Sequence, residues 1–127
     1  MKYIKKLLIL GFHSTNLILI IFYLYPGSIF GYILYGDKSI QPQLTRDFII
    51  SSNHLYAFIV LSTLGIVAYQ NTKKIKFIIV YLFFLSIILE LFHLIIPNRG
   101  FEMSDLFGNI IGVILIIIIY KVKDKYV

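Results

Sequence analysis

Four long, continuous runs of apolar residues limit this chain to folds that cross a membrane. The runs cover approximately residues 7–25, 55–69, 77–96 and 106–120, and they exclude nearly all charged side chains. A hydrocarbon core of about 30 Å needs about 20 helical residues. The runs do not alternate as transmembrane strands do, and four strands could not close a barrel. The sequence therefore predicts an all-α membrane protein, a bundle of four transmembrane helices in a single domain over 1–127.

The composition excludes several other classes of protein. Hydrophobic residues make up 59% of the chain and charged residues 14%, which leaves too little polar surface for a small soluble globule. The net charge of +6 does not indicate nucleic-acid binding, because the lysines lie in short clusters beside the apolar runs. The chain has no cysteine, so disulfides, thiolate metal sites and a cysteine nucleophile are excluded. It has no glycine-rich phosphate loop, and we expect no cofactor.

The distribution of basic residues predicts the orientation of the helices. Three segments fall on one side of a four-span topology, namely the N-terminal tail, the turn at 70–76 and the C-terminal tail. Each holds three lysines, whereas the other side holds three basic residues against four acidic ones. Because cytoplasmic loops are enriched in basic residues, both termini are expected in the cytoplasm. The first run resembles a signal peptide but is longer and has no cleavage site after it, so we expect it to stay as a span.

The long connection at 26–53 is then expected outside the cytoplasm. Its first half is rich in glycine and tyrosine, which suits a chain at the lipid interface. Its second half, around Arg46 and Asp47, is expected to form an interfacial turn of helix or an extension of the second span.

Polar side chains gather at the outer ends of three predicted helices. Glu90 lies about 9 Å inside the end of the third run, at 1.5 Å per residue, and His93 shares its face three residues later. Asp105 and Asn109 share a face of the fourth run, and His54 lies at the outer end of the second. Ionisable groups within a span are costly and usually functional. We therefore expect an extracytoplasmic ligand-binding cluster with these members: His54, Glu90, His93, Arg99, Asp105 and Asn109.

The segment at 90–112 resembles the VanZ-like family of bacterial membrane proteins. That family carries a glutamate, a glutamine, and then a proline, an arginine, an aromatic residue, an aspartate, an asparagine and a glycine at about this spacing. The matching residues here are Glu90, Pro97, Arg99, Phe101, Asp105, Asn109 and Gly112. The stretch 54–58 is similar to the histidine-aromatic opening of the family's second helix. His93 stands where the family usually has glutamine, and Ser52-Asn53 replaces its usual Asp-Lys pair.

The resemblance implies a four-helix protein of the bacterial cytoplasmic membrane with a role in the cell envelope. The founding member is associated with resistance to the lipoglycopeptide antibiotic teicoplanin, and many relatives have no assigned activity. Together with the outer cluster, the resemblance leads us to expect binding of an amphiphilic envelope molecule. Candidates are a lipid headgroup, a lipid-linked wall precursor or a lipoglycopeptide, with Arg99 holding the anionic part.

Two other functions stay open on the sequence. One is an intramembrane enzyme that acts on a phospholipid or a polyprenyl-linked wall precursor, with Glu90 as general acid or base and His93 assisting. The other is a helper subunit that packs against a second membrane protein. Gly108 and Gly112 form the small-xxx-small pair that would permit such close packing.

Structural roles compete with these functional ones. Glu90 and Arg99 could form a buried ion pair, in which removal of one partner costs about 3–5 kcal/mol. Asp105 is expected to be the N-cap of the fourth helix, and Asn109 is expected to form hydrogen bonds between helices. In the first run, His13 and Asn16 are expected to make packing contacts of the same kind.

A metal site has less support from the sequence. Glu90 and His93 have the i, i+3 spacing of carboxylate-bridged metal bundles, and His54 and Asp105 would complete a set of ligands. Those bundles use two such motifs, whereas this chain has one. The resemblance also places glutamine, a poor ligand, at position 93. The sequence therefore predicts no metal.

Overall fold

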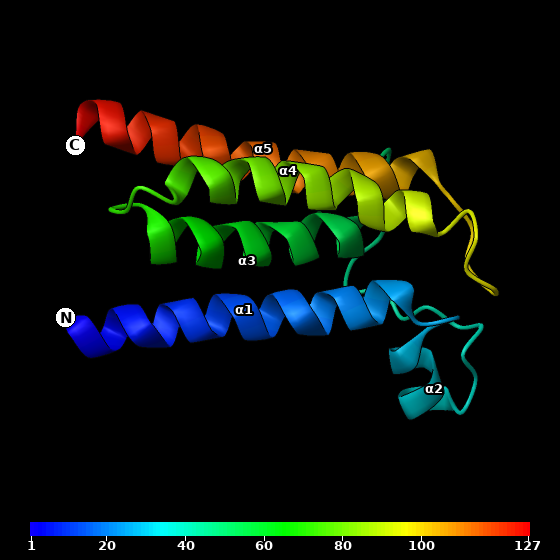
Figure 1. Ribbon diagram of the computed structural model, residues 1–127. Coiled ribbons are helices and arrows are strands. Elements are labelled where there is room, and N and C mark those ends of the chain that lie inside the picture. The colour runs from blue at the N-terminus through cyan, green and yellow to red at the C-terminus, as the bar shows by residue number, and fades with distance from the viewer.

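The apolar runs form helices because a helix pairs its backbone N–H and C=O groups within one segment, as hydrocarbon surroundings require. The computed structural model describes all residues, 1–127, and contains five helices and no strand. Four of them are long and apolar enough to cross a membrane. They are α1 (Lys2–Leu24), α3 (Ser52–Tyr69), α4 (Ile75–Phe92) and α5 (Met103–Tyr126), and they lie side by side (Figure 1). The four predicted apolar helices are thus confirmed, and they fit a multi-pass membrane protein.

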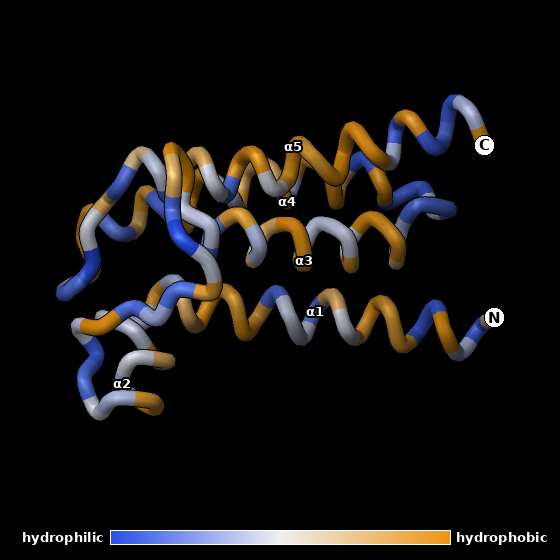
Figure 2. Tube along the Cα trace, turned by 180° about the vertical axis from the view of Figure 1, so that it is seen from behind, coloured by the Kyte–Doolittle hydropathy of each residue, from blue (hydrophilic) through white to orange (hydrophobic).

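Both termini lie at one end of the bundle, together with the turn between α3 and α4 (Figure 1). The three segments with three lysines each therefore share this end. The loop that carries Arg99 lies at the opposite end, beside the short helix α2 (Ile29–Tyr35). Hydrophilic residues gather at the two ends and hydrophobic ones along the middle of the long helices (Figure 2). Which end faces the cytoplasm stays a prediction from the basic residues.

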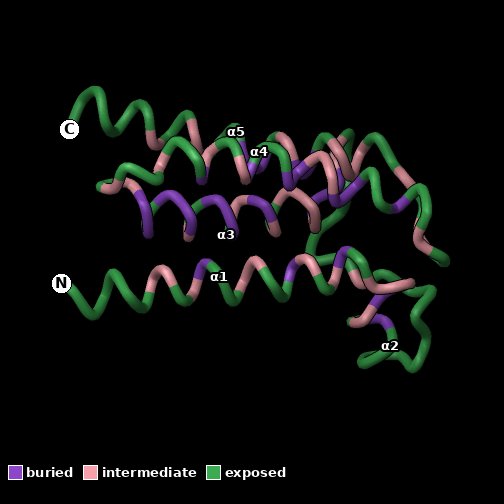
Figure 3. The backbone as a smooth tube through the Cα atoms, in the orientation of Figure 1, coloured by how far each residue is buried: buried purple, intermediate pink, exposed green.

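Helix α3 forms the centre of the packing. It contacts α1, α4 and α5, and a larger share of it is buried than of any other long helix, whereas the outward faces of the other long helices are exposed (Figure 3). Phe58 and Leu61 of α3 are fully buried. Large apolar side chains such as Phe84 and Ile118 point outward and are exposed. That exposure is expected of a surface that contacts lipid chains.

Two glycines let α5 lie directly against α3. A Cβ atom at Gly108 would lie 2.7 Å from the Ser51 carbonyl oxygen, and one at Gly112 would lie 2.8 Å from the Leu55 carbonyl oxygen. Both obstacles are backbone atoms, which cannot move aside as a flexible side chain would. The glycine pair that the sequence offered to a partner protein is therefore covered by α3 of the same chain.

Replacing Gly112 by alanine should lower the thermal stability of the protein in detergent, although alanine favours helix by up to about 1 kcal/mol. The added methyl group overpacks the interface between α5 and α3, at a cost of about 1–3 kcal/mol. Gly11→Ala in α1 is the matched control, because a Cβ atom there meets nothing within 4 Å. It should leave the Tm unchanged or raise it. Equal Tm values for the two variants would contradict this packing.

The helix boundaries differ from the predicted spans at several ends. Helix α4 ends at Phe92 rather than at 96, and the segment 93–98 forms turns. Pro97 explains this, because proline has no N–H to donate and disfavours helical backbone in the preceding residue. Helix α5 begins earlier than predicted, at Met103, and runs on to Tyr126.

The long connection between α1 and α3 also differs from the prediction. Its helix, α2, lies in the first half, where Ser28 accepts a hydrogen bond from the Gly31 N–H at 2.9 Å and Gly36 ends the helix with φ 67°. The second half is not helical, and α3 begins at Ser52, so both alternatives for the segment around Arg46, a turn of helix and an extension of the second span, are wrong. Instead, the Asp47 carboxylate accepts from the Ser52 N–H at 2.8 Å and fixes this segment at the start of α3.

The polar residues of α1 make the predicted packing contacts. The His13 ring lies 2.9 Å from the Tyr69 hydroxyl of α3, and the Asn16 amide donates to the Tyr81 hydroxyl of α4 at 2.6 Å. These bonds fix α1 against its neighbours in the half of the bundle nearer the termini.

Candidate functional site

The residues predicted to form a cluster come together at the end of the bundle opposite the termini. His54 lies in the first turn of α3, Glu90 near the end of α4, and Asp105 and Asn109 in the first turns of α5. Glu90 and Asn109 are completely buried, although both are polar. Buried polar groups need hydrogen-bond partners, so their contacts define the site.

A network of hydrogen bonds around Asn109 joins all four long helices. The Asn109 amide donates from Nδ2 to the Ser86 carbonyl oxygen of α4 at 3.1 Å. Its Oδ1 accepts from the Tyr23 hydroxyl of α1 at 2.5 Å and lies 3.0 Å from His54 Nδ1 of α3. The Tyr23 hydroxyl also lies 2.9 Å from the same His54 nitrogen. The interhelical role predicted for Asn109 is thus confirmed.

Glu90 and His93 form a second buried pair. His93 Nε2 lies 3.0 Å from the Tyr23 carbonyl oxygen, which can only accept, so this nitrogen carries a hydrogen. His93 Nδ1 lies 3.1 Å from Glu90 Oε1, and a proton must lie between these two atoms. The Glu102 backbone N–H donates to the same oxygen at 3.2 Å. The other oxygen, Glu90 Oε2, is buried with no hydrogen-bond partner.

Arg99 binds the end of α1 rather than Glu90. Its Nη2 donates to the Phe22 carbonyl oxygen at 2.6 Å and its Nε to the Tyr25 carbonyl oxygen at 3.1 Å. The carbonyl groups at a helix C-terminus have no partner within the helix and favour a cation. No salt bridge joins Arg99 to Glu90, so the predicted buried ion pair is wrong. Partial burial lowers the pKa of the Arg99 guanidinium from its usual value, but a guanidinium stays charged at neutral pH.

Asp105 is not the N-cap of α5, contrary to the prediction. The cap position is Glu102, which makes no side-chain cap bond, and Asp105 lies in the first turn of the helix. Its Oδ2 lies 3.4 Å from His54 Nε2. The Ser51 N–H donates to the Ser104 carbonyl oxygen at 3.1 Å and holds the start of α5 against the start of α3. This docking turns Asp105 toward His54 rather than toward its own amides.

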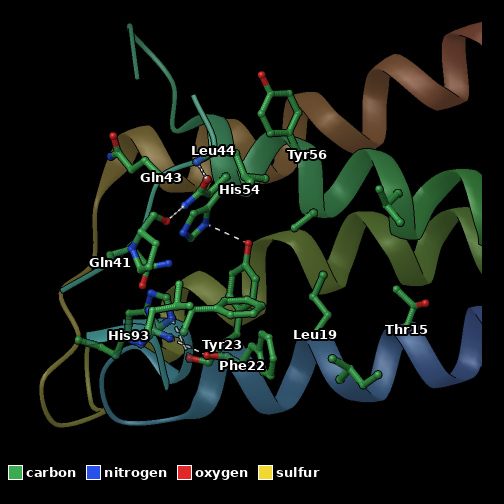
Figure 4. Close-up of a pocket in the computed structure, with 18 residues that line it drawn as sticks. Thr15, Leu19, Phe22, Tyr23, Gln41, Gln43, Leu44, His54, Tyr56 and His93 are labelled. Carbon is green, nitrogen blue, oxygen red and sulfur yellow. Dashed lines mark hydrogen bonds between the residues drawn. The ribbon is translucent and has the colours of Figure 1, made fainter. Parts of the chain in front are cut away.

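Two cavities of different character meet at this cluster. A cavity of about 510 Å³ lies between α1, α2 and α3, and its lining includes apolar side chains of all three, such as Leu19, Phe30 and Val60 (Figure 4). A cavity of about 250 Å³ has no hydrophobic residue in its lining. The following residues line both cavities: Gln41, Gln43, Asn53, His54, His93 and Arg99. An apolar space and a polar space therefore adjoin each other at the cluster, and these residues contribute to the walls of both.

The family model for VanZ/LLP1 matches residues 8–124. The chain belongs to the VanZ/LLP1 family. This match confirms the resemblance seen at 90–112 and extends it over nearly the whole chain. Neither a search of curated proteins nor a search of solved structures gave a significant match.

Tyr23 is a site residue of this VanZ/LLP1 protein that the sequence prediction missed. It is buried, its hydroxyl binds Asn109, and its carbonyl oxygen accepts from His93. Figure 4 shows its ring extending from α1 toward His54. The available signal was a tyrosine inside an apolar run, because a buried tyrosine hydroxyl usually finds a polar partner. The loop residues Gln41 and Gln43 were also missed, and no local pattern marks them.

Proposed function

We propose that this protein binds an amphiphilic molecule of the bacterial cell envelope in the cytoplasmic membrane. The polar part of the ligand would lie in the smaller cavity and its hydrocarbon chain in the larger one. The observation that supports the proposal is that His54, His93 and Arg99 line both an apolar and a polar cavity, so the two cavities adjoin at these residues. With both termini in the cytoplasm, as the basic residues predict, the site faces the outer leaflet.

The larger cavity has the properties of a hydrocarbon-chain site. Its volume of about 510 Å³ lies within the range of small-molecule pockets, about 300–1,000 Å³. Its walls on α1 and α2 include Ile18, Leu19, Phe22, Phe30 and Leu34. Because the chain of a membrane amphiphile comes from an equally apolar bilayer, close packing against these side chains, rather than removal of the chain from water, would hold it there.

The smaller cavity has the properties of a headgroup site. Lys38 and Arg99 supply positive charge, and Asp47, Glu102 and Asp105 supply negative charge on its walls. Arg99 uses Nε and Nη2 on the end of α1, which leaves Nη1 for a phosphate or carboxylate oxygen. Amide side chains from the connecting loop add further donors and acceptors. Mixed charges and amides suit a headgroup that carries phosphate together with hydroxyl or amino groups.

Filling the larger cavity should weaken binding of the amphiphile without unfolding the protein. Val60 lines this cavity and is 52% exposed, whereas Val67 lies two turns later on the same face of α3, is 41% exposed and does not line it. Val60→Trp should therefore lower the amount of envelope lipid that copurifies with the protein by about tenfold, or about 1.4 kcal/mol. Val67→Trp should have no effect. Mass spectrometry of lipids extracted from the two purified variants makes the comparison, and equal amounts would argue against the cavity as the chain site.

An enzyme acting on a phospholipid or polyprenyl-linked precursor is the alternative. The contact of His54 with Asp105 favours it, because both line the polar cavity and a histidine beside a carboxylate can transfer protons. Envelope lipids would be compared in cells that make the wild type, Glu90→Gln or no protein. A lipid whose mass changes only with the wild type would favour the enzyme. Unchanged lipids with equal expression would favour the binding protein.

A further inference from the structure

Three potential metal ligands from three different helices converge at the wall of the polar cavity. They are His54 of α3, Glu90 of α4 and Asp105 of α5. When each contributes one nitrogen or oxygen atom, the three atoms lie within 4.8 Å of one another. His54 and Asp105 also line the polar cavity, whereas Glu90 lies completely buried behind them. The group is therefore accessible from one side only.

The hydrogen bonds of Asn109 fix which His54 nitrogen is free to bind a cation. Because Asn109 Nδ2 donates to the Ser86 carbonyl oxygen, the amide orientation is set and Oδ1 faces His54 Nδ1 at 3.0 Å. Oδ1 only accepts, so His54 Nδ1 carries the hydrogen. In the neutral ring, Nε2 then presents its lone pair to Asp105 Oδ2 at 3.4 Å. Metal-binding histidines are commonly oriented in this way, with the second nitrogen donating to a protein oxygen.

Protonation of His54 alone would not give all three side chains a partner. A protonated His54 would pair with Asp105, but Glu90 Oε2 would stay buried without a hydrogen-bond partner, 3.8 Å from His54 Nδ1. An unpaired carboxylate oxygen in such surroundings is costly. A divalent cation bound by His54, Asp105 and Glu90 would satisfy all three at once.

We infer that His54, Glu90 and Asp105 form a binding site for a divalent cation of the zinc type. Zn²⁺ takes imidazole nitrogen and carboxylate oxygen at about 2.0–2.2 Å, so two of its tetrahedral ligands lie about 3.4 Å apart. The distance between His54 Nε2 and Asp105 Oδ2 has this value. Glu90 Oε2 lies 3.8 Å from His54 Nδ1, so the Glu90 side chain must shift toward the Nε2 side of the ring to join the ion. A fourth position would face the polar cavity, where a water or a ligand oxygen completes the tetrahedron.

Titration with metal ions alone tests this site, so the result does not depend on binding of an amphiphile. The full-length protein, purified in detergent without a polyhistidine tag and stripped with a chelator, would be titrated with Zn²⁺ and with Co²⁺. We expect one ion per chain, a higher Tm with Zn²⁺, and the intense visible absorption of tetrahedral Co²⁺. Less than half an ion per chain, or only the weak absorption of octahedral Co²⁺, would overturn the proposal.

Substitution of single residues would show which side chains bind the ion. His54→Gln and Asp105→Asn should each weaken Zn²⁺ binding by about 100-fold or more, since even residues behind the ligands change affinity about 10–100-fold. Glu102→Gln is the matched control, because Glu102 lines the same cavity but does not belong to the group. It should bind Zn²⁺ like the wild type. Unchanged affinity in His54→Gln would overturn the proposal. If both ligand variants fail to fold, X-ray absorption of the Zn²⁺-loaded wild type would identify the atoms bound to the ion. A bound ion without an imidazole ligand would also overturn the proposal.

Discussion

Asn109→Leu should lower the free energy of unfolding by about 2–4 kcal/mol, the largest stability change that we expect from one substitution. Leucine has nearly the shape of asparagine but can neither donate nor accept. The change removes three buried hydrogen bonds between helices, with the Tyr23 hydroxyl, His54 Nδ1 and the Ser86 carbonyl oxygen. Each buried hydrogen bond contributes about 0.5–1.5 kcal/mol. Unfolding in mixed micelles of increasing SDS content, followed by circular dichroism, would measure the effect.

Asn16→Leu is the matched control for this prediction. Asn16 makes one side-chain hydrogen bond between helices, to Tyr81, and its Oδ1 has no partner. Loss of that single bond, together with removal of an unpaired oxygen, should change the free energy of unfolding by about 1 kcal/mol or less. If the two variants were equally stable, the network around Asn109 would not be the contact that joins the helices at this end.

Arg99→Ala should abolish binding of the amphiphile, with a loss of at least about 30-fold, or about 2 kcal/mol. Alanine removes the charge at the junction of the two cavities and also releases the end of α1. Arg99→Lys keeps the charge but not the planar fork that reaches two carbonyl groups and a ligand together. It should therefore bind with intermediate affinity. Binding of a fluorescent phospholipid to the purified variants would show whether their affinities follow this order.

Arg46→Ala is the control for the loss of one positive charge. Arg46 is an exposed loop residue that lines neither cavity, so its loss should leave binding unchanged. Melting curves of all variants would show whether weaker binding comes from the missing contact with the ligand or from a destabilised C-terminal end of α1. Full binding by a folded Arg99→Ala variant would show that Arg99 holds only the helix.

The four helices and the position of the polar cluster were predictable because both follow from one-dimensional properties. Apolar length determines which segments form long helices, and position within each run places His54, Glu90, His93 and Asn109 at one end. The i, i+3 spacing of Glu90 and His93 also predicts their shared face, and the structure has them 3.1 Å apart. Local spacing and span order were sufficient for this part of the site.

The partners of the cluster could not be predicted because they depend on contacts between distant segments. Arg99 binds the carbonyl oxygens of Phe22 and Tyr25, more than 70 positions earlier in the chain. Opposite charges nearby in the sequence predict a pairing of Arg99 with Glu90, which the structure does not contain. Local position predicts Asp105 as a helix cap, but the docking of α5 on α3 directs it to His54 instead.

The larger cavity depends on a helix that the sequence did not reveal. Helix α2 is short, and the glycines and tyrosines of the first half of the connection predicted only a chain at the lipid interface. Its cap, Ser28, and its end, Gly36, are the usual signals of a short helix. Phe30 and Leu34 of this helix line the cavity.

Native mass spectrometry of the wild-type protein, released from nanodiscs made of bacterial lipids, would show whether an amphiphile is bound. We expect one amphiphilic molecule to stay bound to each folded chain. We also expect this adduct to be lost in Arg99→Ala and in Val60→Trp but kept in Arg46→Ala and Val67→Trp. A wild-type protein without a bound amphiphile, or an adduct kept equally by all four variants, would contradict the proposed binding.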